Sequence, residues 1–159
     1  KVEFNAKGYD ELATLGKSLN GMVEGLRERE EMRGELMAAE EIQKRLLPSE
    51  VPKNLKGRAD IAGFYKAMAG VGGDYFDYIG LGSDFVAIAM GDVSNHGVGP
   101  ALVMAMTRSQ LHAALREKEI SLKQILLKLN EQLYEETPAN IFVTFFLALY
   151  NLKTGELQY

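Results

Sequence analysis

The chain has 159 residues, of which 47% are hydrophobic, and this composition fits one folded domain or a small domain with a helical extension. A formal net charge of -4 gives no global basic face, so we expect no nucleic-acid partner, and the absence of cysteine excludes disulfides and thiolate chemistry. No apolar run approaches the roughly 20 residues of a membrane span, so the chain as given is expected to be soluble.

The first part of the chain has the apolar spacing of a long helix over residues 10–47. Leucine and methionine recur three and four positions apart, as at positions a and d of a heptad: Leu12, Leu15, Leu19, Met22 and Leu26. This seam predicts a coiled coil, with a homodimer as the expected assembly. Near residues 29–32 the register slips by three positions, which fits either a solvated helix that has left its partner or a junction between two packing modes.

The remaining elements alternate short strands with two helices. Pro48 should end the long helix at Leu47, and residues 49–57 are interpreted as an extended linker. Ser121 is expected to cap the second of the later helices. The expected elements are strands at 59–65, 75–79 and 85–90, helices at 100–115 and 121–138, a strand at 141–150 and the start of a return strand at 157–159.

Two aspartates that follow glycine flank the expected hairpin. Asp74 follows a glycine pair, and Asp92 follows Gly91 at the end of an apolar run typical of a buried strand. If the strands pair, both carboxylates lie at one end of one sheet, where their repulsion favours a bound cation such as magnesium or manganese. The backbone carbonyl of Val93 could supply a further ligand. Alternatively, each aspartate only caps a strand end. Asp77 is offset by an odd number from Asp74 and is expected on the opposite face.

The segment after Asp92 connects a buried strand to a helix start. Its glycines allow backbone N–H groups to approach a ligand, and a helix N-terminus favours negative charge, so Gly97 and its neighbours could contact a phosphate. His96 could be a general acid or a phosphate contact, although a single loop histidine is more often a surface residue. His112 falls within a helix and is interpreted as structural. No Ser-His-Asp set is recognisable.

Three motifs in order resemble the SpoIIE-like branch of the PPM metal-dependent serine/threonine phosphatases. They are Ala39-Glu-Glu-Ile-Gln-Lys-Arg-Leu-Leu-Pro48, Val71-Gly-Gly-Asp-Tyr-Phe-Asp77 and Gly91-Asp-Val-Ser-Asn-His-Gly-Val-Gly-Pro-Ala-Leu-Val-Met-Ala105. Residues 10–22 look like the last helix of a HAMP signalling module. On this basis the chain divides into the end of a HAMP-like helix (1–26), a signalling helix with its linker (27–57) and the N-terminal part of a phosphatase domain (58–159).

The resemblance implies an α+β fold in which two β-sheets form a sandwich flanked by helices, here partial and preceded by a long coiled-coil helix. It implies two Mn2+ or Mg2+ ions, with Asp92 bridging both, Val93 lending its carbonyl and Asp74 as a further ligand. The ions would activate a water that attacks phosphorus in line. Asn95 stands where the family usually has glycine. Asn tolerates a left-handed backbone conformation better than most residues do, so the loop is expected to keep its shape.

The resemblance also implies a setting for this chemistry. The expected substrate is phosphoserine or phosphothreonine on a small regulatory protein of the anti-sigma-factor antagonist type. The full-length protein is expected to be cytoplasmic in its catalytic part and anchored upstream at the inner face of the cell membrane. The chain lacks an initial Met and stops before the family's later acidic ligands, so we expect a fragment with an incomplete metal site and little or no activity. The alternative function is a non-catalytic, dimeric binding module.

Overall fold

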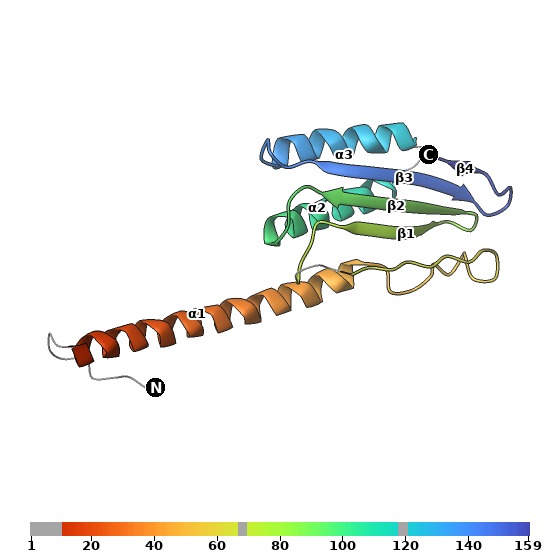
Figure 1. Ribbon diagram of the computed structural model, residues 1–159. Helices are drawn as coiled ribbons and strands as arrows, with labels where there is room; N and C mark the ends of the chain where they lie inside the picture. The colour runs from red at the N-terminus through yellow and green to blue at the C-terminus, as the bar shows by residue number, and fades with distance from the viewer. Residues whose placement is uncertain (1–10, 67–69, 118–120) are drawn as a thin grey trace. The chain divides into compact units, whose positions relative to one another are not determined.

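A computed structural model describes residues 11–66, 70–117 and 121–159 (Figure 1). These residues form two compact units, residues 1–39 and residues 40–159, and each unit is described by itself. The first helix, α1, extends over Glu11–Leu46 and contributes its last two turns, residues 40–46, to the second unit. Its bounds agree within one residue with the predicted helix, because apolar spacing and the proline after Leu47 are local signals.

In the first unit the structure describes residues 11–39, which belong to α1. The heptad leucines and methionines Leu12, Leu15, Met22 and Leu26 are exposed there, whereas charged residues follow them toward the C-terminal end of the helix. A single helix of this kind gains little from its own propensity, because most helical stability in proteins comes from packing of an apolar face. The exposed seam is therefore the surface on which a partner helix is expected to pack.

The second unit is built on one antiparallel sheet with the strand order β1-β2-β3-β4 (Figure 1). The strands are β1 (Tyr75–Leu81), β2 (Phe85–Val93), β3 (Val143–Asn151) and β4 (Leu157–Gln158). In the register, Tyr75 pairs with Gly91, and Gly91 pairs with Phe145 on the other side. The predicted hairpin of β1 and β2 is therefore present, and the start of β1 lies beside the end of β2.

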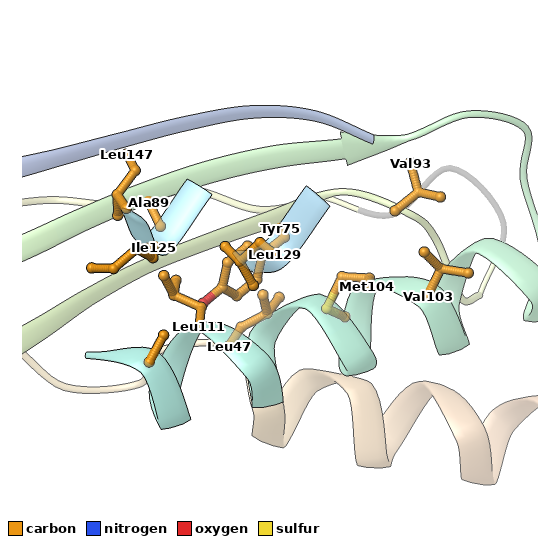
Figure 2. Packing of buried hydrophobic residues seen from close by; sticks show 11 residues of the cluster. Leu47, Tyr75, Ala89, Val93, Val103, Met104, Leu111, Ile125, Leu129 and Leu147 are labelled. Atoms are coloured by element: carbon orange, nitrogen blue, oxygen red, sulfur yellow. The ribbon is translucent and has the colours of Figure 1, made fainter. Parts of the chain in front are cut away.

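Helices α2 (Val98–Ala114) and α3 (Leu122–Glu136) cover one face of this sheet. The core between them includes Met104 and Leu111 from α2, Ile125 and Leu129 from α3, and Leu147 from β3 (Figure 2). Side chains alternate along each strand, so only every second strand residue enters this core. The other face of the sheet carries Phe76, Met90 and Phe146, of which the last two are exposed.

The caps of the later helices follow the sequence expectations. Ser121 accepts a hydrogen bond from the backbone N–H of Gln124, and the Gln124 side chain accepts one from the Ser121 N–H, which completes a capping box. Pro100 occupies the first turn of α2, where its missing N–H has no cost. These features are local, and the prediction for Ser121 is confirmed.

Two expectations for the segment between α1 and β1 are wrong. Residues 59–65 form no strand, because β1 pairs only with β2 in the described part of the chain and offers this segment no ladder. The linker is not simply extended either, since residues 53–58 form turns that bury Leu55. The Asn54 amide donates to the carbonyls of Gly82 and Phe85 at 3.2 and 2.9 Å, so these turns hold the β1–β2 hairpin turn.

The described residues thus have an α+β fold with one four-stranded sheet and three helices. Within the described ranges, no helix combines the length and the apolar character that crossing a membrane requires.

Candidate metal centre

Asp74 and Asp92 lie together at one end of the β1–β2 hairpin. Asp74 directly precedes β1, and Asp92 is next to Gly91, the ladder partner of Tyr75. By strand alternation, Asp92 is on the same face as Met90, away from the helices. Partial burial, followed by the charge and side-chain hydrogen bond of Asp92, raises the pKa of Asp74 above its ordinary value of 3.8. The two carboxyl groups are therefore close enough to disfavour their both being charged.

Gly73 lets the backbone of Val93, the residue after Asp92, approach the segment that carries Asp74. The Val93 N–H donates to the Gly73 carbonyl at 3.3 Å. A Cβ placed on Gly73 would lie 2.7 Å from the Val93 carbonyl oxygen and 2.8 Å from its Cβ, so a larger residue would push the two segments apart. The glycine at position 73 is thus explained by the close approach of the two backbone segments.

The turn between β2 and α2 is fixed by backbone geometry and by β3. Asn95 has φ 71° and Gly97 has φ 97°, so the expectation that Asn tolerates the left-handed region here is confirmed. The Ser94 N–H donates to the Phe142 carbonyl at 2.9 Å, and the Phe142 N–H donates to the Ser94 hydroxyl at 3.0 Å. His96 lies exposed in this turn. Across the described ranges, no hydrogen bond or ion pair joins His96 or Gly97 to either carboxylate.

A depression of about 860 Å³ borders the carboxylates on the open face of the sheet. Its lining combines Asp74 and Asp92 with apolar side chains such as Phe76 and Met90, and residues 61–66 form one of its walls. Gly63 lies against the Phe76 ring, where an added Cβ would clash with the ring carbons. A charged ligand at this edge would therefore be in contact with solvent on one side and with apolar protein on the other.

Asp77 lies on the opposite face, under the helices, as its odd offset predicted. It is 5% exposed and accepts a hydrogen bond from the Tyr75 hydroxyl at 3.0 Å. His112 Nε2 lies 2.7 Å from the same Asp77 oxygen, and Arg108 Nε forms an ion pair with it at 3.8 Å. Burial, then the Asp77 carboxylate, raises the pKa of Tyr75 well above its ordinary 10, so the hydroxyl stays a donor.

This network was only partly visible in the sequence. His112 was expected to be structural, and it is found in a helix bonded to a buried carboxylate. Arg108, which pairs with the same carboxylate, is four residues earlier, and this spacing places both side chains on one face of α2. The spacing could have predicted that the two side chains lie together, but not that both interact with Asp77, which is on a strand distant in the chain.

The donors at the hairpin end fit a hard divalent cation. Carboxylate and carbonyl oxygens are the ligands that magnesium and manganese prefer, and the mutual contact of Asp74 and Asp92 is relieved by positive charge between them. No cluster of three or more His, Cys, Asp or Glu side chains suited to a metal occurs in the part of the chain that the structure describes. The described residues therefore supply a two-carboxylate site, to which water and other groups would add ligands.

Comparison with known proteins finds relatives of this chain. Residues 82–159 match the family described as Stage II sporulation protein E (SpoIIE). Phosphoserine phosphatase RsbU of Bacillus subtilis (strain 168) is 28% identical over 131 residues, which cover 82% of this chain and 38% of RsbU. The chain is therefore similar to the SpoIIE family over residues 82–159, and it spans less than half the length of RsbU.

Two solved structures resemble this chain in fold. The RsbU and RsbW domains of Rv1364c from Mycobacterium tuberculosis match with a TM-score of 0.52 and 26% identity, over 59% of this chain and 26% of that one. The SiaA-PP2C domain of Pseudomonas aeruginosa matches with a TM-score of 0.58 over 77% of this chain and 54% of that one. At 22% identity, the second likeness shows the fold alone.

The contact between the two carboxyl groups predicts a titration in the metal-free protein. Because the folded pKa of Asp74 is raised, its protonation favours the folded state at low pH, and this contribution is lost as pH rises through the raised pKa. Asp92→Asn should bring the pKa of Asp74 back toward 3.8, since it removes the neighbouring charge. Carboxyl 13C NMR titration of both proteins without metal measures this shift. An Asp74 pKa that stays unchanged in the variant would contradict the assignment.

Proposed function

We propose that the chain belongs to a protein serine/threonine phosphatase that hydrolyses phosphoserine or phosphothreonine with the help of two Mn2+ or Mg2+ ions. The observation that supports this most directly is the pairing of Asp74 and Asp92 beside the Val93 carbonyl within a SpoIIE-like domain. Phosphate-ester hydrolysis is a reaction for which paired metal sites are suited.

Within this proposal, the site residues have distinct roles. Asp74, Asp92 and the Val93 carbonyl would hold the ions, which when bound supply Lewis acidity and an activated water. The N-terminus of α2, with the backbone N–H of Gly97 and the exposed His96 before it, would bind phosphate oxygens, because unpaired N–H groups and the helix dipole favour an anion. The open edge of the sheet would admit a phosphorylated loop of another protein.

The proposed substrate is a small phosphorylated regulatory protein of the anti-sigma-factor antagonist type. RsbU is named as a phosphoserine phosphatase, and in Rv1364c an RsbU domain occurs with an RsbW domain. These relatives support a role in partner-switching signalling. We also propose that the exposed seam of α1 forms a homodimeric, HAMP-like coiled coil and that the full-length protein is anchored upstream at the inner face of the membrane, with its phosphatase domain in the cytoplasm.

The proposal is tested by phosphate release from the full-length protein with Mn2+. The substrates are phosphoserine forms of candidate regulatory proteins, and RsbU assayed in parallel with its own substrate is the positive control. We expect Mn2+-dependent release that chelation with EDTA abolishes. If no phosphoprotein is hydrolysed while RsbU is active, the phosphatase proposal is wrong. Retained binding of the regulatory protein without hydrolysis would then favour the alternative, a dimeric binding module without catalytic activity.

A further inference from the structure

Gln43, in the last turns of α1, binds the backbone just before Asp74. Its Nε2 donates to the Gly72 carbonyl at 2.6 Å, and the Gly72 N–H donates to its Oε1 at 3.0 Å. Both groups of the side-chain amide are thus matched by both groups of one glycine, 29 residues away in the chain. The side chain is 4% exposed. Breaking a pair of hydrogen bonds in such a place leaves buried polar groups without partners.

A second anchor lies directly after the end of α1. Leu47, four residues after Gln43, packs in the core with Tyr75, the residue that follows Asp74 (Figure 2). By contrast, the neighbouring Glu41 is exposed and pairs only within the helix, with Arg45 at 2.8 Å. Gln43 near the end of α1 and Leu47 directly after it thus both hold this part of the chain to the segment that carries Asp74.

From Gly72 the contact continues to the metal ligands. Gly73, the next residue, accepts the Val93 N–H at 3.3 Å and leaves room for the Val93 carbonyl, and Asp74 follows directly. Two glycines in succession give this loop more backbone freedom than any other pair would. The two hydrogen bonds from Gln43 to Gly72 restrict this freedom. Without them, movement of the loop would displace Asp74 relative to Asp92.

We propose that Gln43 is a positioning residue for the metal centre: it holds the Gly72 peptide so that Asp74 and the Val93 carbonyl stay in place to bind a divalent cation. The inference rests on the proposed function, to which it adds a residue of α1 that touches neither metal nor substrate. Groups that orient metal ligands from outside the coordination sphere typically change metal affinity by about 10- to 100-fold when they are removed. It also gives the helix a direct contact through which its position can affect the site.

The test is Mn2+ binding by the full-length protein, measured by titration calorimetry. Gln43→Leu removes both hydrogen bonds with little change in side-chain size, and we expect its Mn2+ dissociation constant to rise about tenfold. Glu41→Leu, on the exposed side of the same turn, is the matched control and should bind Mn2+ as the wild type does. Gln43→Glu, which keeps one acceptor and loses the donor, should also weaken binding and serves if the leucine variant does not fold.

Amide hydrogen exchange provides a second measurement that does not depend on catalysis. In Gln43→Leu the amide of Gly72 should exchange faster, whereas amides in the middle of β2 should not change. The inference is overturned if Mn2+ affinity stays within twofold of wild type in folded Gln43 variants, or if the Gly72 amide keeps its protection. A lower thermal midpoint with unchanged Mn2+ affinity would show a merely structural role and would also overturn it. If wild-type protein binds Mn2+ in a Gln43-dependent manner but hydrolyses no phosphoprotein, the phosphatase proposal fails and the positioning role stands.

Discussion

Asp92→Asn is expected to reduce the phosphatase activity of the full-length protein by at least about 100-fold, because loss of groups that merely orient metal ligands already costs about 10- to 100-fold. The asparagine retains one oxygen and the size of the side chain but loses the charge that a divalent cation requires. The same change removes the like charge next to Asp74, whose pKa is raised in part by Asp92. The metal-free variant should therefore unfold at the same temperature as wild type or a higher one.

These opposite effects separate a ligand from a structural residue. Activity is measured as Mn2+-dependent phosphate release, and stability by thermal unfolding in EDTA. Asp84→Asn is the control, since Asp84 lies at the other end of the hairpin in ion pairs with Arg58 at 3.4 Å and Lys153 at 2.8 Å. It should leave activity unchanged. Asp92→Asn with near wild-type activity would show that Asp92 does not hold a catalytic metal.

The features that could be predicted from the sequence depend on short-range signals. The end of α1 follows from Pro48, the start of α3 from the Ser121 capping box, and the meeting of Asp74 and Asp92 from a hairpin whose strands adjoin in the chain. An antiparallel pair joined by a short turn has one natural register, so the positions of its ends are fixed by counting residues.

The features that could not be predicted depend on contacts between distant segments. Residues 59–65 have the composition of a strand, but a strand also needs a partner ladder, and sequence alone does not provide one. The hydrogen bond of Gln43 to Gly72 spans 29 residues. The sequence of the helix does not distinguish a glutamine that makes such a contact from one that is exposed to solvent. The hydrogen-bonded role of Asp77 could not be predicted either, because Arg108 and His112, with which it interacts, come from α2.

Asp77→Ala is expected to lower the free energy of unfolding by about 3 kcal/mol, within the range found when one partner of a buried ion pair is removed. Asp77 is 5% exposed, and its carboxylate is shared by Tyr75, Arg108 and His112. Loss of the carboxylate leaves the Tyr75 hydroxyl without its acceptor. It also leaves the Arg108 and His112 side chains without the negative charge with which they interact. Chemical denaturation measures the change, and Glu41→Ala, an exposed control, should have little effect.

A double-mutant cycle shows whether the network acts as a unit. The three variants are Asp77→Ala, His112→Ala and the double variant. The double variant should lose less free energy of unfolding than the sum of the two single losses, by about 1 kcal/mol or more, because the second change removes a group that the first left unpaired. Exact additivity would mean that the 2.7 Å contact between His112 Nε2 and Asp77 contributes nothing. Because β1 begins directly after Asp74, coupling between Asp77 and His112 would show that α2 stabilises the strand that follows this proposed metal ligand.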